Sequence, residues 1–187
     1  MAVTRREYDF YPTPAWCVRR LLEAVDLPGG RWLEPAVGDG AIVRAVDELR
    51  DDVHWTTVDV RDEVEADFHY DFVAPLFQGP VAVHAYDVCI TNPPFSQALE
   101  FVVESRRRAR VVAMLLRLCW LASRERNDWL GATMPDVYVL PDRPSFTGNG
   151  SDMTEYAWMV WRSRDRATGE LRVLRKTPIN ERRGVQL

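Results

Sequence analysis

Short apolar runs rich in β-branched and aromatic residues alternate along this chain with longer segments whose apolar residues recur every three to four positions. The first pattern predicts buried strands, and the second predicts amphipathic helices. The predicted strands cover residues 31–34, 54–59, 88–91, 111–116, 137–140 and 156–161. The predicted helices cover residues 14–25, 41–49, 97–108 and 119–133. This alternation predicts an α/β domain with a mainly parallel central sheet and helices on both of its faces.

The ends of these elements carry further signals. We expect Thr13 to cap the first helix with Pro14 at its first position, and Ser96 to cap the helix that follows the strand 88–91. Residues 61–78 read as a loop with short irregular elements, and residues 81–85 as a brief strand or a turn. The length of the chain fits one domain over residues 1–176, followed by a polar tail, 177–187, whose composition is compatible with disorder.

Charge is distributed unevenly. The net charge of −4 argues mildly against a dedicated nucleic-acid binder. Acidic residues gather in 47–71, arginines gather in 106–126, and Lys176 is the one lysine. Arginine suits bidentate contacts with phosphate. The arginines are therefore either solvated helix faces or a rim that grips phosphates around a substrate.

Several classes of protein are disfavoured. The three cysteines are odd in number and irregularly spaced, and the histidines lack the spacing of a metal site. We therefore expect no disulfide framework and no metal, and a reducing cytoplasm. The chain has no apolar signal segment and no apolar run long enough to cross a bilayer, so we expect no membrane partner.

The sequence Asn92-Pro93-Pro94-Phe95 directly follows the strand 88–91. Ligands of open α/β sheets bind at the carboxyl ends of the strands. Proline fixes φ and donates no N–H, so the backbone after Asn92 is stiff and its carbonyls are not used by a strand ladder. We expect the Asn92 side-chain oxygen and the Pro93 carbonyl to accept hydrogen bonds from an –NH2 group, with Phe95 as a face for a planar ring. A plain proline turn is the alternative interpretation.

A second motif lies between the strand 31–34 and the helix 41–49. Gly38 and Gly40 allow a sharp turn there and a close approach of the backbone to a ligand. About 20 residues later the next strand ends in Asp59, the spacing of a carboxylate that binds a ribose. No third glycine follows, which disfavours a pyrophosphate cofactor and favours a nucleoside-like cofactor without phosphates.

Together these motifs resemble those of S-adenosylmethionine-dependent amino-methyltransferases. More closely, the chain resembles the small phage-type DNA N6-adenine methyltransferases over most of residues 8–161. The likeness lies in Phe10-Tyr11-Pro12-Thr13-Pro14, Tyr70-Asp71-Phe72, Ile90-Thr91-Asn92-Pro93-Pro94-Phe95, Arg143-Pro144-Ser145-Phe146 and Glu155-Tyr156-Ala157-Trp158. It implies a Rossmann-like methyltransferase fold, S-adenosyl-L-methionine as cofactor, and methylation of adenine N6 in DNA in the cytoplasm of a bacterial host.

The resemblance also implies roles for individual residues. The methionine part of the cofactor falls to Glu34, Pro35, Gly38 and Gly40, and the ribose to Asp59. Asp71 and Phe72 are expected to bind the cofactor adenine. Tyr11, Thr13 and Pro14 are expected to close the cofactor pocket. Asp67 with Phe68 is a competing register for the adenine contact, and simple helix capping is the alternative for the N-terminal residues.

On the substrate side, Asn92, Pro93, Pro94 and Phe95 are the expected catalytic residues, with Phe95 stacked on a base flipped out of the duplex. Phe146 and Arg143, on one loop, are candidate substrate contacts, although Phe146 is nearly as well explained as a core aromatic. Trp158 and Trp161 read as strand core.

The sequence leaves little room for a separate target-recognition domain, which predicts short or relaxed specificity. The Asn-Pro-Pro-Phe motif alone does not separate adenine from other planar amino groups. Methylation of RNA or of a glutamine side chain therefore stays open, as does a non-catalytic module that only binds the cofactor.

Overall fold

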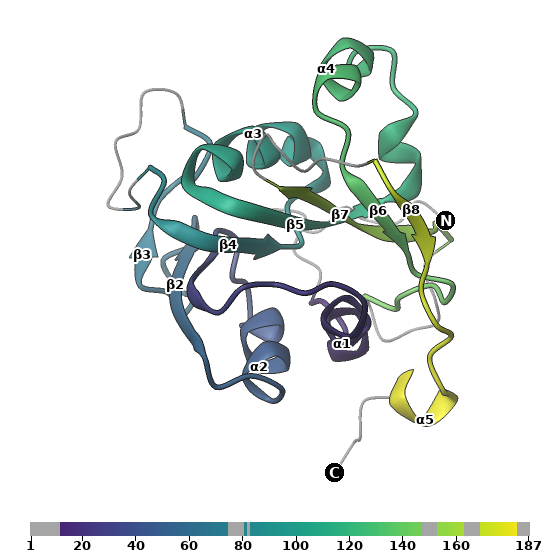
Figure 1. Cartoon of the computed structure of the whole chain (residues 1–187). Coiled ribbons are helices and arrows are strands. Elements are labelled where there is room, and N and C mark those ends of the chain that lie inside the picture. The colour runs from purple at the N-terminus through teal and green to yellow at the C-terminus, as the bar shows by residue number, and fades with distance from the viewer. Residues whose placement is uncertain (1–11, 75–80, 82, 147–152, 163–168, 183–187) are drawn as a thin grey trace, which may run out of the picture.

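The computed structural model describes residues 12–74, 81, 83–146, 153–162 and 169–182. Within them lies one eight-stranded sheet of order β3-β2-β1-β4-β5-β7-β6-β8 (Figure 1). Strand β7 is antiparallel to both of its neighbours, and every other neighbouring pair is parallel. The α/β class and the mainly parallel sheet predicted from the sequence are therefore confirmed.

The elements have the following bounds. The strands are β1 (Gly30–Glu34), β2 (Val53–Asp59), β3 (Phe68–His69), β4 (Tyr86–Thr91), β5 (Ala109–Arg117), β6 (Asp136–Val139), β7 (Tyr156–Arg162) and β8 (Leu171–Val173). The α-helices are α1 (Ala15–Ala24), α2 (Ala41–Asp47), α3 (Ala98–Arg108), α4 (Asn127–Ala132) and α5 (Ile179–Arg182). Two 3₁₀ turns are η2 (Phe95–Gln97) and η3 (Leu118–Leu121).

The central strands β4, β5 and β7 are buried on both faces because helices cover each side of the sheet. Helices α1 and α2 pack on one face and α3 on the other (Figure 1). Successive side chains of a strand point to opposite faces, and accordingly Trp32 joins the cluster under α1 while Leu33 joins the cluster under α3. Trp158 and Trp161, three positions apart on β7, fall on opposite faces, and both are buried as predicted.

The predicted continuous helix 119–133 is wrong. The chain forms the turn η3 and the separate short helix α4, joined by a polar stretch without an apolar stripe. The Arg126 side chain donates to the Trp120 carbonyl at 2.8 Å, and the Trp120 ring packs edge-on against Trp161 at 5.9 Å. These contacts fix Trp120 in the core and divert the chain from a regular helix.

The predicted helix caps are also wrong. Helix α1 begins after Pro14, which has an extended backbone and makes no side-chain capping bond, and Thr13 is instead a buried residue. Ser96 lies inside η2, and Gln97 takes the N-cap position of α3 without a side-chain capping bond. Because the prolines already set the backbone at both helix starts, no hydroxyl cap is required there.

The segment after β7 holds more structure than its polar composition suggests. Strand β8 extends the sheet beside β6. Thr177, the first residue of the predicted tail, is fully buried, and its N–H donates to Asp142 at 2.6 Å. Arg20 on α1 forms an ion pair with Glu181 on α5. The described part of the predicted tail therefore contacts the domain, whereas residues 183–187 lie outside the described residues.

Two further findings concern the described part of the chain. None of its helices combines the length and the apolar character needed to cross a membrane. It contains no group of three or more histidine, cysteine or acidic side chains that could hold a metal ion.

Candidate active site

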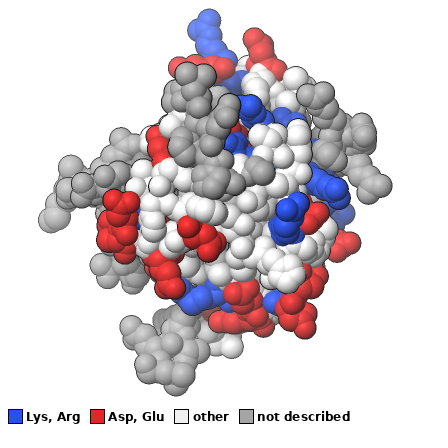
Figure 2. Space-filling model, turned by 90° about the vertical axis from the view of Figure 1, so that its left-hand side faces the viewer, with Lys and Arg blue, Asp and Glu red and all other residues white. Residues whose placement is uncertain are grey.

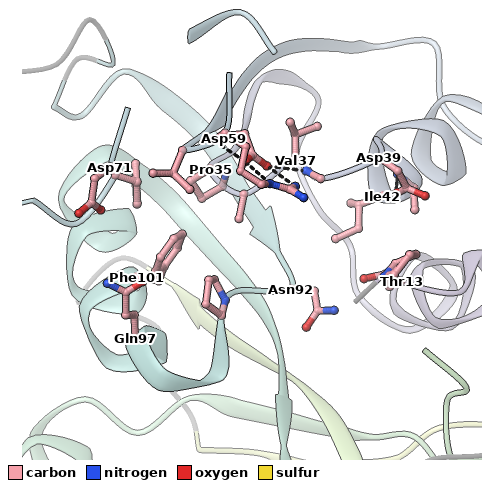
Figure 3. Close-up of a pocket in the computed structure, with 18 of the residues that line it drawn as sticks. Thr13, Pro35, Val37, Asp39, Ile42, Asp59, Asp71, Asn92, Gln97 and Phe101 are labelled. Carbon is pink, nitrogen blue, oxygen red and sulfur yellow. Dashed lines mark hydrogen bonds and ion pairs between the residues drawn. The ribbon is translucent and has the colours of Figure 1, made fainter. Parts of the chain in front are cut away.

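A cavity of about 570 Å³ lies at the carboxyl ends of β1, β2 and β4 (Figure 3). The parallel arrangement of these strands brings their ends to one edge of the sheet. Predicted site residues that line the cavity are Thr13, Pro35, Gly38, Asp59, Asp71, Phe72, Asn92 and Pro94. Other predicted residues that are described but do not line it are Pro14, Glu34, Gly40, Pro93, Phe95, Phe146 and Arg143. Tyr11 lies outside the described residues.

The turn between β1 and α2 forms one wall of the cavity. Gly38 and Gly40 have φ angles of 59° and 77°, in the left-handed region that favours glycine. Gly38 lines the cavity, and its N–H donates to Asp59 at 2.9 Å. Gly40 is the N-cap of α2, and a Cβ there would lie 3.1 Å from the Arg44 guanidinium. The two glycines therefore shape the turn, and Gly38 also ties it to the end of β2.

Asp59, the last residue of β2, is buried and lines the cavity. Its two carboxylate oxygens accept hydrogen bonds from the Arg61 side chain at 2.9 and 3.0 Å. Burial alone would raise the pKa of Asp59, but the bonds from Arg61 and the Gly38 N–H outweigh that effect and hold the pKa below its ordinary value. Asp59 is therefore a fixed negative charge in the cavity wall.

The structure separates the two candidate registers for the cofactor-adenine contact. Asp67 precedes β3 and accepts hydrogen bonds from the N–H and the hydroxyl of Thr57, at 2.8 and 3.0 Å. Asp71 follows β3 and lines the cavity together with Phe72. The Phe72 ring lies 5.4 Å from that of Phe101, another residue of the cavity wall. This geometry favours Asp71, which remains a proposed contact.

Glu34 ends β1 but does not contribute to the cavity wall. Its side chain is buried, and one carboxyl oxygen accepts the Ala36 N–H at 3.3 Å. The other oxygen, Oε2, is buried without a hydrogen-bond partner in the described part of the chain. Burial raises the pKa of Glu34 well above its ordinary value. The neutral acid is therefore the favoured form of Glu34 over a wide pH range.

Asn92 follows β4 and lines the same cavity as Gly38, Asp59 and Asp71. In the view of Figure 3, Asp71, Gln97 and Phe101 lie toward one end of the cavity, and Thr13 and Asp39 toward the other. Asn92 lies between these two groups, nearer to Thr13. Pro93 is buried and Pro94 lines the cavity, so the proline pair fixes the backbone that carries the amide.

Phe95 belongs to an aromatic cluster beside the cavity. The Arg117 guanidinium lies 4.4 Å from the centre of the Phe95 ring, and Arg117 Nε donates to the Tyr156 hydroxyl at 3.3 Å. The Tyr156 ring lies 5.9 Å from Phe95 and 5.0 Å from Phe146. Phe146 is part of the hydrophobic core, as its alternative interpretation held. Arg143 forms an ion pair with Glu155 at the surface.

The sequence interpretation missed several residues of the cavity wall. They include Val37, Asp39, Ile42, Val60, Arg61, Tyr70, Gln97 and Phe101. Val60 and Arg61 directly follow the predicted acid Asp59, and Tyr70 directly precedes Asp71, so proximity to a predicted acid was a usable signal. Phe101 had none, because an apolar residue on an amphipathic helix reads as core.

No protein-family model matches this chain, and no curated protein sequence matches it. Solved structures do share its fold. A methyltransferase subunit of a type I restriction-modification system from Streptococcus thermophilus has a TM-score of 0.59 and 14% identity, over 86% of this chain and 45% of that one. A putative class I S-adenosylmethionine-dependent methyltransferase from Listeria monocytogenes has a TM-score of 0.55 and 16% identity, over 86% and 62%. A putative RNA methyltransferase from Pyrococcus horikoshii has a TM-score of 0.60 and 16% identity, over 89% and 92%.

The matched region thus amounts to less than half of the Streptococcus subunit and less than two thirds of the Listeria protein. Identities this low carry information about the fold alone. The eight-stranded order, the helices on both faces and the cavity at the strand ends agree with that likeness. The chain has the Rossmann-like fold of S-adenosylmethionine-dependent methyltransferases.

Proposed function

We propose that this chain is an S-adenosyl-L-methionine-dependent methyltransferase that acts on an amino group of a planar ring, namely N6 of adenine in DNA. One observation carries the proposal: Asn92 and Pro94 line the same cavity as Gly38, Asp59 and Asp71. Asn92 can accept hydrogen bonds from the substrate amine, and Gly38, Asp59 and Asp71 can bind a nucleoside. All four residues line one cavity, so the cofactor and the substrate amine can meet there.

The residues present fit the cofactor. A cavity of about 570 Å³ lies within the usual range for a small-molecule site. Val37, Val60 and Phe101 provide apolar wall on which a purine can pack, and Asp59 and Asp71 provide acceptors for its polar edge and its ribose. When bound, S-adenosyl-L-methionine supplies an electrophilic methyl group on a sulfonium.

The residues of the chain position the substrate amine and provide hydrogen-bond acceptors for it. The lone pair of an exocyclic amine is delocalised into its ring, so the amine is a poor nucleophile. The Asn92 side-chain oxygen and the Pro93 carbonyl accept its two N–H groups, which favours a pyramidal nitrogen whose lone pair points into the cavity. Holding the nitrogen in this way supplies much of the rate enhancement. The proton can leave after transfer, so the site needs no strong base.

Phe95 stacks on the target base, and Arg117 and Tyr156 hold the Phe95 ring in place. A base in a duplex must leave the helix stack to reach Asn92, so DNA is bound with the target adenine flipped out. These roles follow from the contacts of the aromatic cluster and from the resemblance of the Asn-Pro-Pro-Phe motif to that of amino-methyltransferases.

Among the described residues, several arginines of the segment 106–126 are engaged in contacts within the chain. Arg107 and Arg108 pair with Glu104, and Arg126 is bonded to a main-chain carbonyl. On the side of the molecule that carries β2 and β3, acidic groups predominate toward the left and the bottom (Figure 2). RNA stays as the second candidate substrate, because the Asn-Pro-Pro-Phe motif does not by itself separate adenine in DNA from a planar amino group in RNA.

The test is methyl transfer from labelled S-adenosyl-L-methionine to duplex DNA, single-stranded DNA, RNA and a protein extract, with the modified unit identified by mass. The variant Asn92→Ala should lose turnover while its affinity for the cofactor changes little. The matched control is Asn180→Ala, an exposed asparagine on α5.

N6-methyladenine in DNA, lost in Asn92→Ala and kept in Asn180→Ala, would support the proposal. Label in RNA or in glutamine would overturn the DNA substrate but keep the chemistry. A cofactor that binds without turnover on any acceptor would instead support a binding module. Loss of cofactor binding in Asn92→Ala would contradict the role given to this amide.

A further inference from the structure

The Asp59 carboxylate accepts four hydrogen bonds within the chain. Oδ1 accepts from the Arg61 N–H at 3.0 Å and from Arg61 Nε at 2.9 Å. Oδ2 accepts from the Gly38 N–H at 2.9 Å and from Arg61 Nη2 at 3.0 Å. A carboxylate has about four acceptor positions, so these bonds use its capacity. A ribose can bind Asp59 only if donors leave it.

Two of the four donors belong to the backbone and two to a side chain. The N–H groups of Gly38 and Arg61 belong to the backbone at the β1–α2 turn and at the end of β2. The other two donors lie on the Arg61 side chain, which lines the same cavity. A guanidinium presents its N–H groups as a planar fork that reaches both oxygens of a carboxylate. The two adjacent hydroxyls of a ribose offer the same pattern of two donors.

Two other carboxylates lie near enough to act on the charge of Arg61. Asp59 chiefly raises the pKa of Arg61 through its hydrogen bonds, and the charges of Glu63 and Asp39 act in the same direction. Glu63 is exposed. Asp39 lies in the cavity wall with 45% of its side chain exposed, and it already forms an ion pair with Arg44 at 3.5 Å that Arg61 would share. A guanidinium that leaves Asp59 can therefore pair with an acid at the rim of the cavity without losing charge compensation.

We propose that Arg61 sets the affinity of the cofactor site by competing with the ribose for Asp59. This inference rests on the proposed function. In the free protein the guanidinium holds Asp59. The two ribose hydroxyls then replace Nε and Nη2, and the Arg61 side chain pairs with Asp39 or Glu63. Breaking the two bonds between the guanidinium and Asp59 costs free energy, and this cost lowers the affinity for the cofactor.

The experiment measures binding of S-adenosylhomocysteine by calorimetry. The variant Arg61→Met keeps the aliphatic stem and removes the fork. It should bind S-adenosylhomocysteine more tightly than the wild type, by up to about tenfold. The matched control is Arg31→Met, at an exposed position in β1, which should bind as the wild type does.

A second variant tests the inference independently of whether Arg61→Met folds. Asp39→Asn with Glu63→Gln removes the receiving acids and should weaken binding of S-adenosylhomocysteine several-fold. Weaker or unchanged binding by folded Arg61→Met would overturn the role of Arg61, and so would wild-type affinity in the double variant. Failure of the wild type to bind S-adenosylhomocysteine would overturn the proposed function itself, and this inference with it.

Discussion

Replacement of Glu34 by glutamine should stabilise the protein, and by more as the pH rises. Glu34 is 1% exposed, and its Oε2 atom has no hydrogen-bond partner in the described residues. Burial therefore raises the pKa of this carboxyl well above its ordinary value of 4.5. Because the folded-state pKa lies above that of the unfolded chain, the stability that neutral Glu34 allows is complete below pH 4.5 and is lost progressively as the pH rises toward the folded-state pKa.

The size of the effect follows from proton linkage. Between the two pKa values the unfolded chain binds one proton fewer than the folded protein at this site. Each pH unit then lowers the free energy of unfolding by about 1.4 kcal/mol. A glutamine side chain at this position cannot titrate, so Glu34→Gln should gain about that amount over the wild type for each pH unit between the ordinary pKa of 4.5 and the raised folded-state pKa. In a domain of this length the gain corresponds to roughly 4 °C in the unfolding midpoint.

The assay is urea or thermal unfolding of both proteins without cofactor at about pH 5.5, 6.0 and 6.5, where the linkage slope acts. Glu65→Gln, at an exposed glutamate, controls for the change of net charge and should leave the pH profile parallel to that of the wild type. Parallel profiles for Glu34→Gln as well would refute the reasoning, because they would mean that Glu34 titrates alike in the folded and the unfolded states.

Three further predictions concern arginines and aspartates of the structure. Arg117→Met should lower kcat in a methyl-transfer assay and leave the cofactor Kd unchanged, because the guanidinium covers the aromatic ring of the substrate side; an equal loss of cofactor affinity would argue against this. Arg20→Met should lower the free energy of unfolding by about 2 kcal/mol in urea titrations, against less than about 1 kcal/mol for exposed Arg19→Met. Asp71→Asn should weaken binding of S-adenosylhomocysteine in calorimetry more than Asp67→Asn does; the reverse order would restore the other register.

Much of the site could be predicted because parallel strands end at one edge of a sheet. Gly38, Asp59 and Asn92 each follow or end a strand in the sequence, so their meeting around one cavity follows from the fold. The apolar run 156–161 likewise predicted a buried strand with Trp158 and Trp161 in the core. These signals depend on local sequence alone.

The rest depended on contacts between distant segments. Whether Glu34 or Pro35 faces the cavity is decided by one residue at a strand end, and the sequence could not resolve that. The position of Asp71 depends on β3, a strand of two residues that no periodicity can detect. Phe146, on a loop, is buried where Tyr156 of β7 packs against it. The sequence also does not predict that the Arg61 side chain pairs with Asp59, because other acidic residues lie nearby in the chain.

The pairing of Arg20 with Glu181 bears on how this protein is made. The two residues are 161 positions apart in the chain. At ordinary rates of synthesis, roughly 10 to 30 s pass between the appearance of the first and that of the second. During this interval helix α1, whose start adjoins the cavity wall at Thr13, has only Glu23 to compensate its buried guanidinium among the ion pairs of the described residues. The cavity should therefore mature late on the ribosome, after the segment around α5 has emerged and docked against α1.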